Sequence, residues 1–101
     1  MESFKTILQE VYEAKLLLKQ LFKYLASTVL GATEFYFLLH REINAEPRMK
    51  QHPGVLFLYV VHLAQSKSVN LCNFKSHFES YRRLYPIVTR KYMSTCFAAI
   101  Q

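Results

Sequence analysis

The segment VLFLYVVHLA, Val55–Ala64, decides the fold class because His62 is its only polar residue. Such a run is far shorter than the ~20 apolar residues that cross a bilayer, so it predicts a buried element of a globular domain. A strand here would need a partner of similar quality to satisfy its backbone groups, and the chain offers none. The segment is therefore expected to be a central helix, with Pro53 at its first turn.

Downstream, the stretch from Ser66 to Lys91 predicts a further helix that Ser68 or Asn70 can cap. Its apolar residues follow the alternating three and four spacing of a helix face. They are Leu71, Phe74, Phe78, Tyr81 and Tyr85. Pro86 ends this helix and opens another over 86–100, with an inner side formed by Ile87, Met93, Phe97 and Ile100.

Upstream, Ser3 is a natural cap for a helix of about six turns. A heptad seam predicts its inner face. The seam consists of Phe4, Ile7, Val11, Ala14, Leu18, Leu21 and Leu25, widened by Leu8, Leu17 and Phe22. The nearby pair Glu10 and Glu13 is expected to be surface charge near the N-terminal end of this helix.

The middle of the chain is less regular. The apolar run Phe35–Leu39 suits a buried strand or a buried helix, and its flanks favour a helix from Thr33 to Asn44. Residues 44–54 contain two prolines and a glycine without apolar periodicity, which is typical of a linker. The chain is thus expected to be one all-α domain over 1–101, a bundle of four to five helices.

Composition and charge point to partners. Hydrophobic residues make up 51% of the chain, although a domain of this size buries only ~65% of its unfolded surface, so a homo-oligomer is expected. Residues 1–46 carry five basic and six acidic side chains, whereas 47–101 carry eight and one. This asymmetry indicates an anionic partner, and the alternative is a solvated face that keeps the protein soluble.

The basic half also contains a pattern similar to a helix-turn-helix unit. Leu63 and Ala64, the polar turn Ser66–Ser68, and Phe74 with Phe78 have suitable offsets, although Ser68 stands where glycine is common. An ordinary helical hairpin satisfies the same spacing. The outer positions of its second helix would be Asn70, Asn73, Lys75, Ser76, His77 and Ser80.

Nucleic acid is the expected ligand of the basic half, DNA or RNA, because clustered cations neutralise phosphates and aromatic planes stack on bases. The candidate binding residues are Lys67, Asn70, Asn73, Lys75, His77, Arg82, Arg83, Arg90 and Lys91. Convergence of the six cations among them on one face would support this interpretation. Scattered cations would instead support the rival interpretation, in which the chain is a protein interaction module that uses exposed apolar surface.

Other functional classes have little support in the sequence. The chain lacks Asp, a glycine-rich phosphate loop and any order of residues typical of a catalytic triad, so we expect no enzyme and no cofactor. A zinc site from His62, Cys72, His77 and Cys96 is disfavoured by their irregular spacing, and two inert core thiols are expected instead. No leader pattern and no membrane span are evident, which predicts an intracellular protein.

Overall fold

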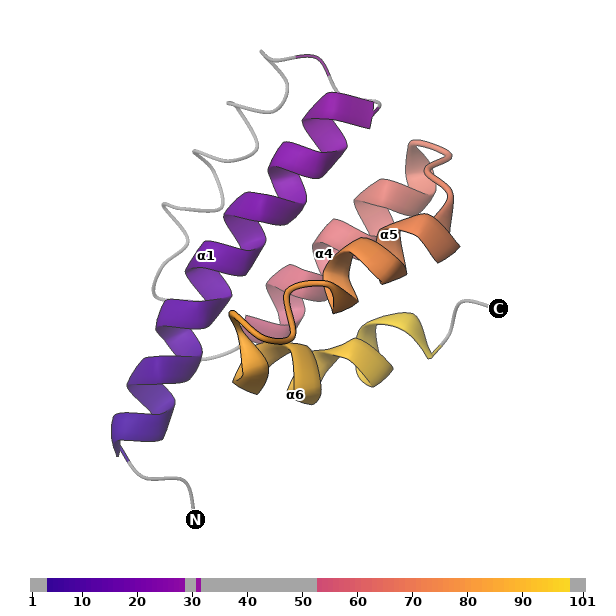
Figure 1. Cartoon of the computed structure of the whole chain (residues 1–101). Coiled ribbons are helices and arrows are strands. Elements are labelled where there is room, and N and C mark those ends of the chain that lie inside the picture. The colour runs from indigo at the N-terminus through magenta and orange to yellow at the C-terminus, as the bar shows by residue number, and fades with distance from the viewer. Residues whose placement is uncertain (1–3, 29–30, 32–52, 99–101) are drawn as a thin grey trace.

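A computed structural model describes residues 4–28, 31 and 53–98, and in these ranges every regular element is a helix. The four helices are α1 (Phe4–Thr28), α4 (Pro53–Ser66), α5 (Leu71–Glu79) and α6 (Pro86–Phe97). Figure 1 shows α1 along one side of α4, α5 and α6, with its N-terminal turns extending beyond them. The all-α bundle is therefore confirmed, while the predicted helix at 33–44 lies outside the described residues.

The core lies where α1, α4 and α6 meet and where α5 packs on α4 and α6. Phe22, Phe57, Phe74 and Phe78 are its largest fully buried side chains. Edge-to-face contacts of Phe78 with Phe57 and Phe97 join α4, α5 and α6 at centroid distances of 5.7 and 5.6 Å. The central position predicted for Val55–Ala64 is confirmed in its inner residues, although Leu58 and His62 are exposed.

The predicted seam of α1 is correct only from Val11 onward. Phe4 and Leu8 are 76% and 53% exposed, and Ile7 is exposed too, because the first turns of α1 project past the start of α6, the part of α6 that lies against α1 (Figure 1). Leu17 and Phe22, which widen the seam, are fully buried. Periodicity thus identified the inner face of α1 but not where along the helix its neighbours stop.

The turn from α4 to α5 closes by backbone hydrogen bonds at the end of α4. The Val69 N–H donates to the Ala64 carbonyl at 3.0 Å, and the Ser68 N–H donates to the Gln65 carbonyl at 3.1 Å. This is the Schellman pattern, and it requires a left-handed residue, which is Ser68 at φ 61°. Asn70 rather than Ser68 caps α5, accepting from the Asn73 N–H at 3.1 Å.

Ser68→Gly is expected to raise the free energy of unfolding by up to about 1 kcal/mol, because glycine adopts the left-handed conformation without a steric cost. Urea unfolding followed by circular dichroism measures the change. Gln65→Gly, in the last turn of α4, is the matched control and should destabilise by a similar amount. Equal destabilisation by both substitutions would contradict the role given to Ser68.

Two predicted boundaries need correction. The helix expected to run to Tyr85 ends at Glu79, because the chain then forms successive turns closed by bonds such as Tyr81 N–H to Phe78 carbonyl at 3.2 Å. The linker expected over 44–54 ends earlier, since Pro53 and Gly54 already belong to α4; its other residues lie outside the described ranges. None of the helices described is both long enough and apolar enough to cross a membrane.

Candidate functional site

The nine predicted nucleic-acid-binding residues lie on three consecutive parts of the fold. Lys67 belongs to the α4–α5 turn, and Asn70, Asn73, Lys75 and His77 to the start and body of α5. Arg82 and Arg83 lie in the connection after α5, and Arg90 and Lys91 on α6. All except His77 are exposed, but several are already engaged within the protein.

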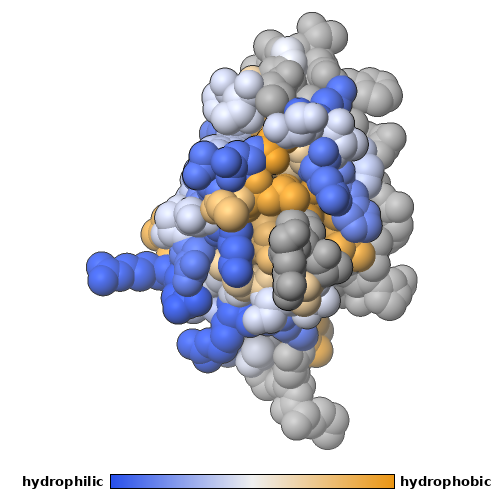
Figure 2. Space-filling view, turned by 90° about the vertical axis from the view of Figure 1, so that its right-hand side faces the viewer, coloured by the Kyte–Doolittle hydropathy of each residue, from blue (hydrophilic) through white to orange (hydrophobic). Residues whose placement is uncertain are grey.

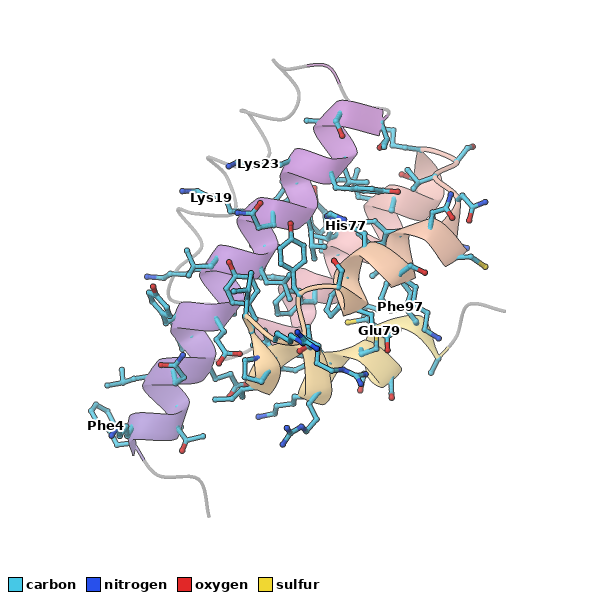
Figure 3. All side chains as sticks on the ribbon, viewed as in Figure 1. Phe4, Lys19, Lys23, His77, Glu79 and Phe97 are labelled. Carbon is cyan, nitrogen blue, oxygen red and sulfur yellow. The ribbon has the colours of Figure 1, made fainter. Side chains whose placement is uncertain are left out.

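Asn70 and His77 serve the fold. The Asn70 side chain caps α5, as described above. The His77 ring stacks on Tyr24 of α1 at a centroid distance of 4.2 Å and meets Tyr81 edge to face at 5.2 Å. Figure 3 shows His77 between α1 and α5. Burial lowers the pKa of His77 from 6.5, so the ring is neutral at pH 7 and adds no cation to the surface.

Arg82 and Lys91 are paired with carboxylates. Arg82 Nη2 lies 3.1 Å from Glu79 Oε1 in an exposed pair. Lys91 Nζ lies 3.1 Å from Glu10 Oε1, and the lysine is the more exposed partner of that pair. Of the three arginines in the described residues, Arg82 is paired with a carboxylate, whereas Arg83 and Arg90 are not.

The six cations do not form one compact cluster. In Figure 1 the α4–α5 turn, which carries Lys67, lies at the opposite end of α5 from the connection that carries Arg82 and Arg83. Lys75 lies between these ends, in the middle of α5. Figure 2 shows a hydrophobic area between hydrophilic side chains on the face seen there, rather than a continuous hydrophilic surface. Lys67 and Lys75 thus lie apart from the other four cations, and this scatter counts toward the rival interpretation of a protein interaction module. The nucleic acid interpretation keeps only the cations in and after the connection from α5 to α6.

Glu10 and Glu13 are buried, which overturns their prediction as surface charges. Glu13 is 1% exposed, and its Oε1 accepts the N–H groups of Ile87 and Val88 at 2.8 and 3.2 Å. Glu10 accepts from the Tyr92 hydroxyl and from Lys91. The two acids of α1 therefore bind the first half of α6 instead of facing water.

Removing these acids from the exterior makes the surface more basic than the sequence suggested. In the described ranges Glu79 is the only exposed carboxylate residue. The exposed cationic residues are Lys5, Lys15, Lys19, Lys23, Lys67, Lys75, Arg82, Arg83, Arg90 and Lys91. The surface of α1 is thus as one-sided in charge as that of α5 and α6, which the charge count of residues 1–46 did not predict.

Side chains that could bind a metal ion are not gathered in the described part of the chain. Residues 4–28 and 53–98 contain no group of three His, Cys, Asp or Glu able to hold a metal ion. Both cysteines are free; Cys72 is exposed, contrary to the prediction of two core thiols, and Cys96 is buried. Burial raises the pKa of Cys96 to about 11, which leaves it a neutral thiol.

A second exposed feature, the outer stripe of α1, was not predicted as one surface. It consists of Phe4, Leu8, Tyr12, Lys15, Lys19 and Lys23, all exposed. Their spacing of four, four, three, four and four places them on one side of the helix, away from Ala14 and Leu21. Figure 3 shows Phe4, Lys19 and Lys23 directed away from the other described helices.

Comparison with known proteins provides no further assignment, because no family model, no curated protein and no solved structure matches the chain. The candidate sites therefore depend on the chemistry of the residues themselves.

Proposed function

We propose that this protein is a non-enzymatic module that binds nucleic acid through phosphate contacts from its basic C-terminal half. The observation that carries the proposal is the charge of the exposed surface over residues 53–98, where six cationic residues stand against the single carboxylate of Glu79. Like charges on a surface repel one another and weaken the compact state, so a polyanion that neutralises them is the favourable partner.

Within that half, Arg83 and Arg90 are the principal contacts. Both are exposed, and among the described residues neither is paired with an acid. Arginine presents several N–H donors to phosphate, and these two need not break an ion pair to do so. Lys75, in the middle of α5, and Lys67, in the α4–α5 turn beyond it, are secondary contacts in this proposal.

The proposed contact is to the backbone of the nucleic acid rather than to base edges. In a helix-turn-helix interpretation, Asn70 and His77 would face the bases, but Asn70 caps α5 and His77 stacks on Tyr24. The Ser80 hydroxyl donates to the His77 carbonyl at 2.6 Å. These three groups already make contacts within the protein, so sequence readout would fall to Asn73, Lys75 and Ser76.

Nucleic acid binding is expected to weaken steeply with salt, since bound phosphates release counterions. Replacing both Arg83 and Arg90 with glutamine should make the slope of log affinity against log salt less steep by about two on duplex DNA. Fluorescence anisotropy with labelled duplex DNA, duplex RNA and single strands measures the affinity. The matched control is Lys19→Gln with Lys23→Gln, which removes two charges from α1.

Two results would remove this proposal. One is the absence of salt-dependent binding to all three nucleic acids. The other is an equal loss of affinity in the arginine pair and the lysine pair, because that outcome would show a general charge effect rather than a contact around the start of α6.

A further inference from the structure

The outer stripe of α1 combines two kinds of surface along one helix. Its first half exposes Phe4, Leu8 and Tyr12 at 76%, 53% and 59%. Its second half exposes Lys15, Lys19 and Lys23. Exposed large apolar side chains are common singly, but three in register on one helix face form a contact surface.

The positive charge of α1 determines which kind of partner can bind the outer stripe. On α1 every exposed charged residue is a lysine, because Glu10 and Glu13 are both turned toward α6. Lysines at intervals of four on a helix repel one another by a few tenths of a kcal/mol per pair. A partner that places carboxylates opposite Lys19 and Lys23 removes that repulsion, and it must also cover Phe4 and Leu8.

We propose that the outer stripe of α1 is a docking site for an acidic amphipathic helix of another protein. The stripe runs over about 20 residues, or ~30 Å, which corresponds to five to six turns of a partner helix. Such a helix would place apolar residues at intervals of three and four against Phe4, Leu8 and Tyr12. Its glutamates or aspartates would lie against Lys19 and Lys23.

Other occupants satisfy the stripe less well. A second copy of α1 in parallel would place lysines against lysines, and in antiparallel orientation it would place lysines against Phe4 and Leu8. Duplex nucleic acid supplies the negative charge but no apolar surface for the first half. A lipid surface favours helices whose apolar and basic residues lie on opposite sides around the axis, whereas here they follow one another along it.

The test uses the full chain and a labelled 21-residue helical peptide. The peptide carries leucines at intervals of three and four in one half and glutamates in the other, in both sequence orders. Control peptides replace the glutamates with lysines or the leucines with serines. Fluorescence anisotropy should show saturable binding of the acidic amphipathic peptide, with loss of binding for both control peptides.

Variants of the protein locate the site. Lys19→Glu with Lys23→Glu should weaken peptide binding about tenfold, and Leu8→Ser should weaken it by a similar factor. Lys67→Glu with Lys75→Glu makes the same charge change on α4–α5 and should leave the affinity within about twofold. Circular dichroism is the folding control, and each variant should keep its helix content because the substituted positions are exposed.

Each of four results overturns the proposal. The first is that the acidic peptide fails to bind. The second is that the Lys19 and Lys23 variant and the Lys67 and Lys75 variant weaken its binding equally. The third is that Lys19→Glu with Lys23→Glu reduces nucleic acid affinity as much as charge reversal of Arg83 and Arg90, which would make α1 part of the nucleic acid surface. The fourth is that sedimentation shows a dimer that Leu8→Ser dissociates, which would make a second copy of the chain the occupant.

Discussion

Replacing Glu13 with alanine is expected to lower the free energy of unfolding by about 3 kcal/mol, more than the loss of an ordinary helix cap. Pro86 has no N–H, and the Ile87 and Val88 N–H groups both donate to Glu13 Oε1. Tyr85, at the N-cap of α6, provides no side-chain acceptor. Without Glu13, two donors near the start of α6 lose their partner, and the favourable charge at the helix N-terminus is lost.

Urea denaturation followed by circular dichroism measures this change. Glu13→Gln keeps an acceptor oxygen but loses the charge, so it should cost about half as much. The matched control is Glu79→Ala, which removes a glutamate whose ion pair with Arg82 is exposed, and its effect should stay below about 0.5 kcal/mol. If Glu13→Ala and Glu79→Ala destabilise equally, Glu13 does not cap α6.

Gly54→Ala is expected to destabilise the protein by about 2 kcal/mol despite the higher helix propensity of alanine. A Cβ atom at Gly54 would lie 2.8 Å from Tyr92 Cε1. The ring cannot easily move aside, because its hydroxyl donates to Glu10 and its face stacks on Phe57 at a centroid distance of 5.5 Å. The added methyl group therefore displaces α4 from α6 or breaks the contact with Glu10.

A double-mutant cycle isolates this contact. Gly54→Ala should cost nothing further in a Tyr92→Ala background, because the ring that the methyl group meets is then absent. Gly31→Ala is the control, since a Cβ atom there meets nothing within 4 Å, and its effect should lie within about 0.5 kcal/mol. Additive costs of Gly54→Ala and Tyr92→Ala would contradict the close packing of α4 on α6.

Helical periodicity predicted where the helices lie better than it predicted which residues of other helices pack against them. The inner residues of α5, Phe74 and Phe78, follow directly from their spacing because a helix has one buried face. The burial of Glu13 has a weaker signal: it lies four residues before Leu17, on the inner face of α1. A reader of the sequence could suspect a buried acid there, but its partner belongs to a helix that is distant in sequence.

The sequence does not show which charged residues of the candidate sites form ion pairs within the protein, and this limited the prediction of those sites. A count of charges treats Lys91 and Arg90 alike, whereas only Lys91 reaches Glu10. The heptad pattern assigned Phe4 and Leu8 to the core, so the outer stripe of α1 was not predicted as one surface. The exposure of Phe4 and Leu8 depends on where the start of α6 lies along α1, and the contacts of Glu10 and Glu13 with α6 fix that position.

The contacts of α6 with the two acids of α1 also bear on the order of folding during synthesis. Glu13 and Ile87 are separated by 74 residues, and Glu10 and Tyr92 by 82. Until α6 is synthesised, Glu10 and Glu13 lack these partners, and the inner face of α1 lacks one of its two principal neighbours among the described helices. We therefore expect the bundle to close late in synthesis, and a chain lacking α6 to leave Glu10 and Glu13 without these partners.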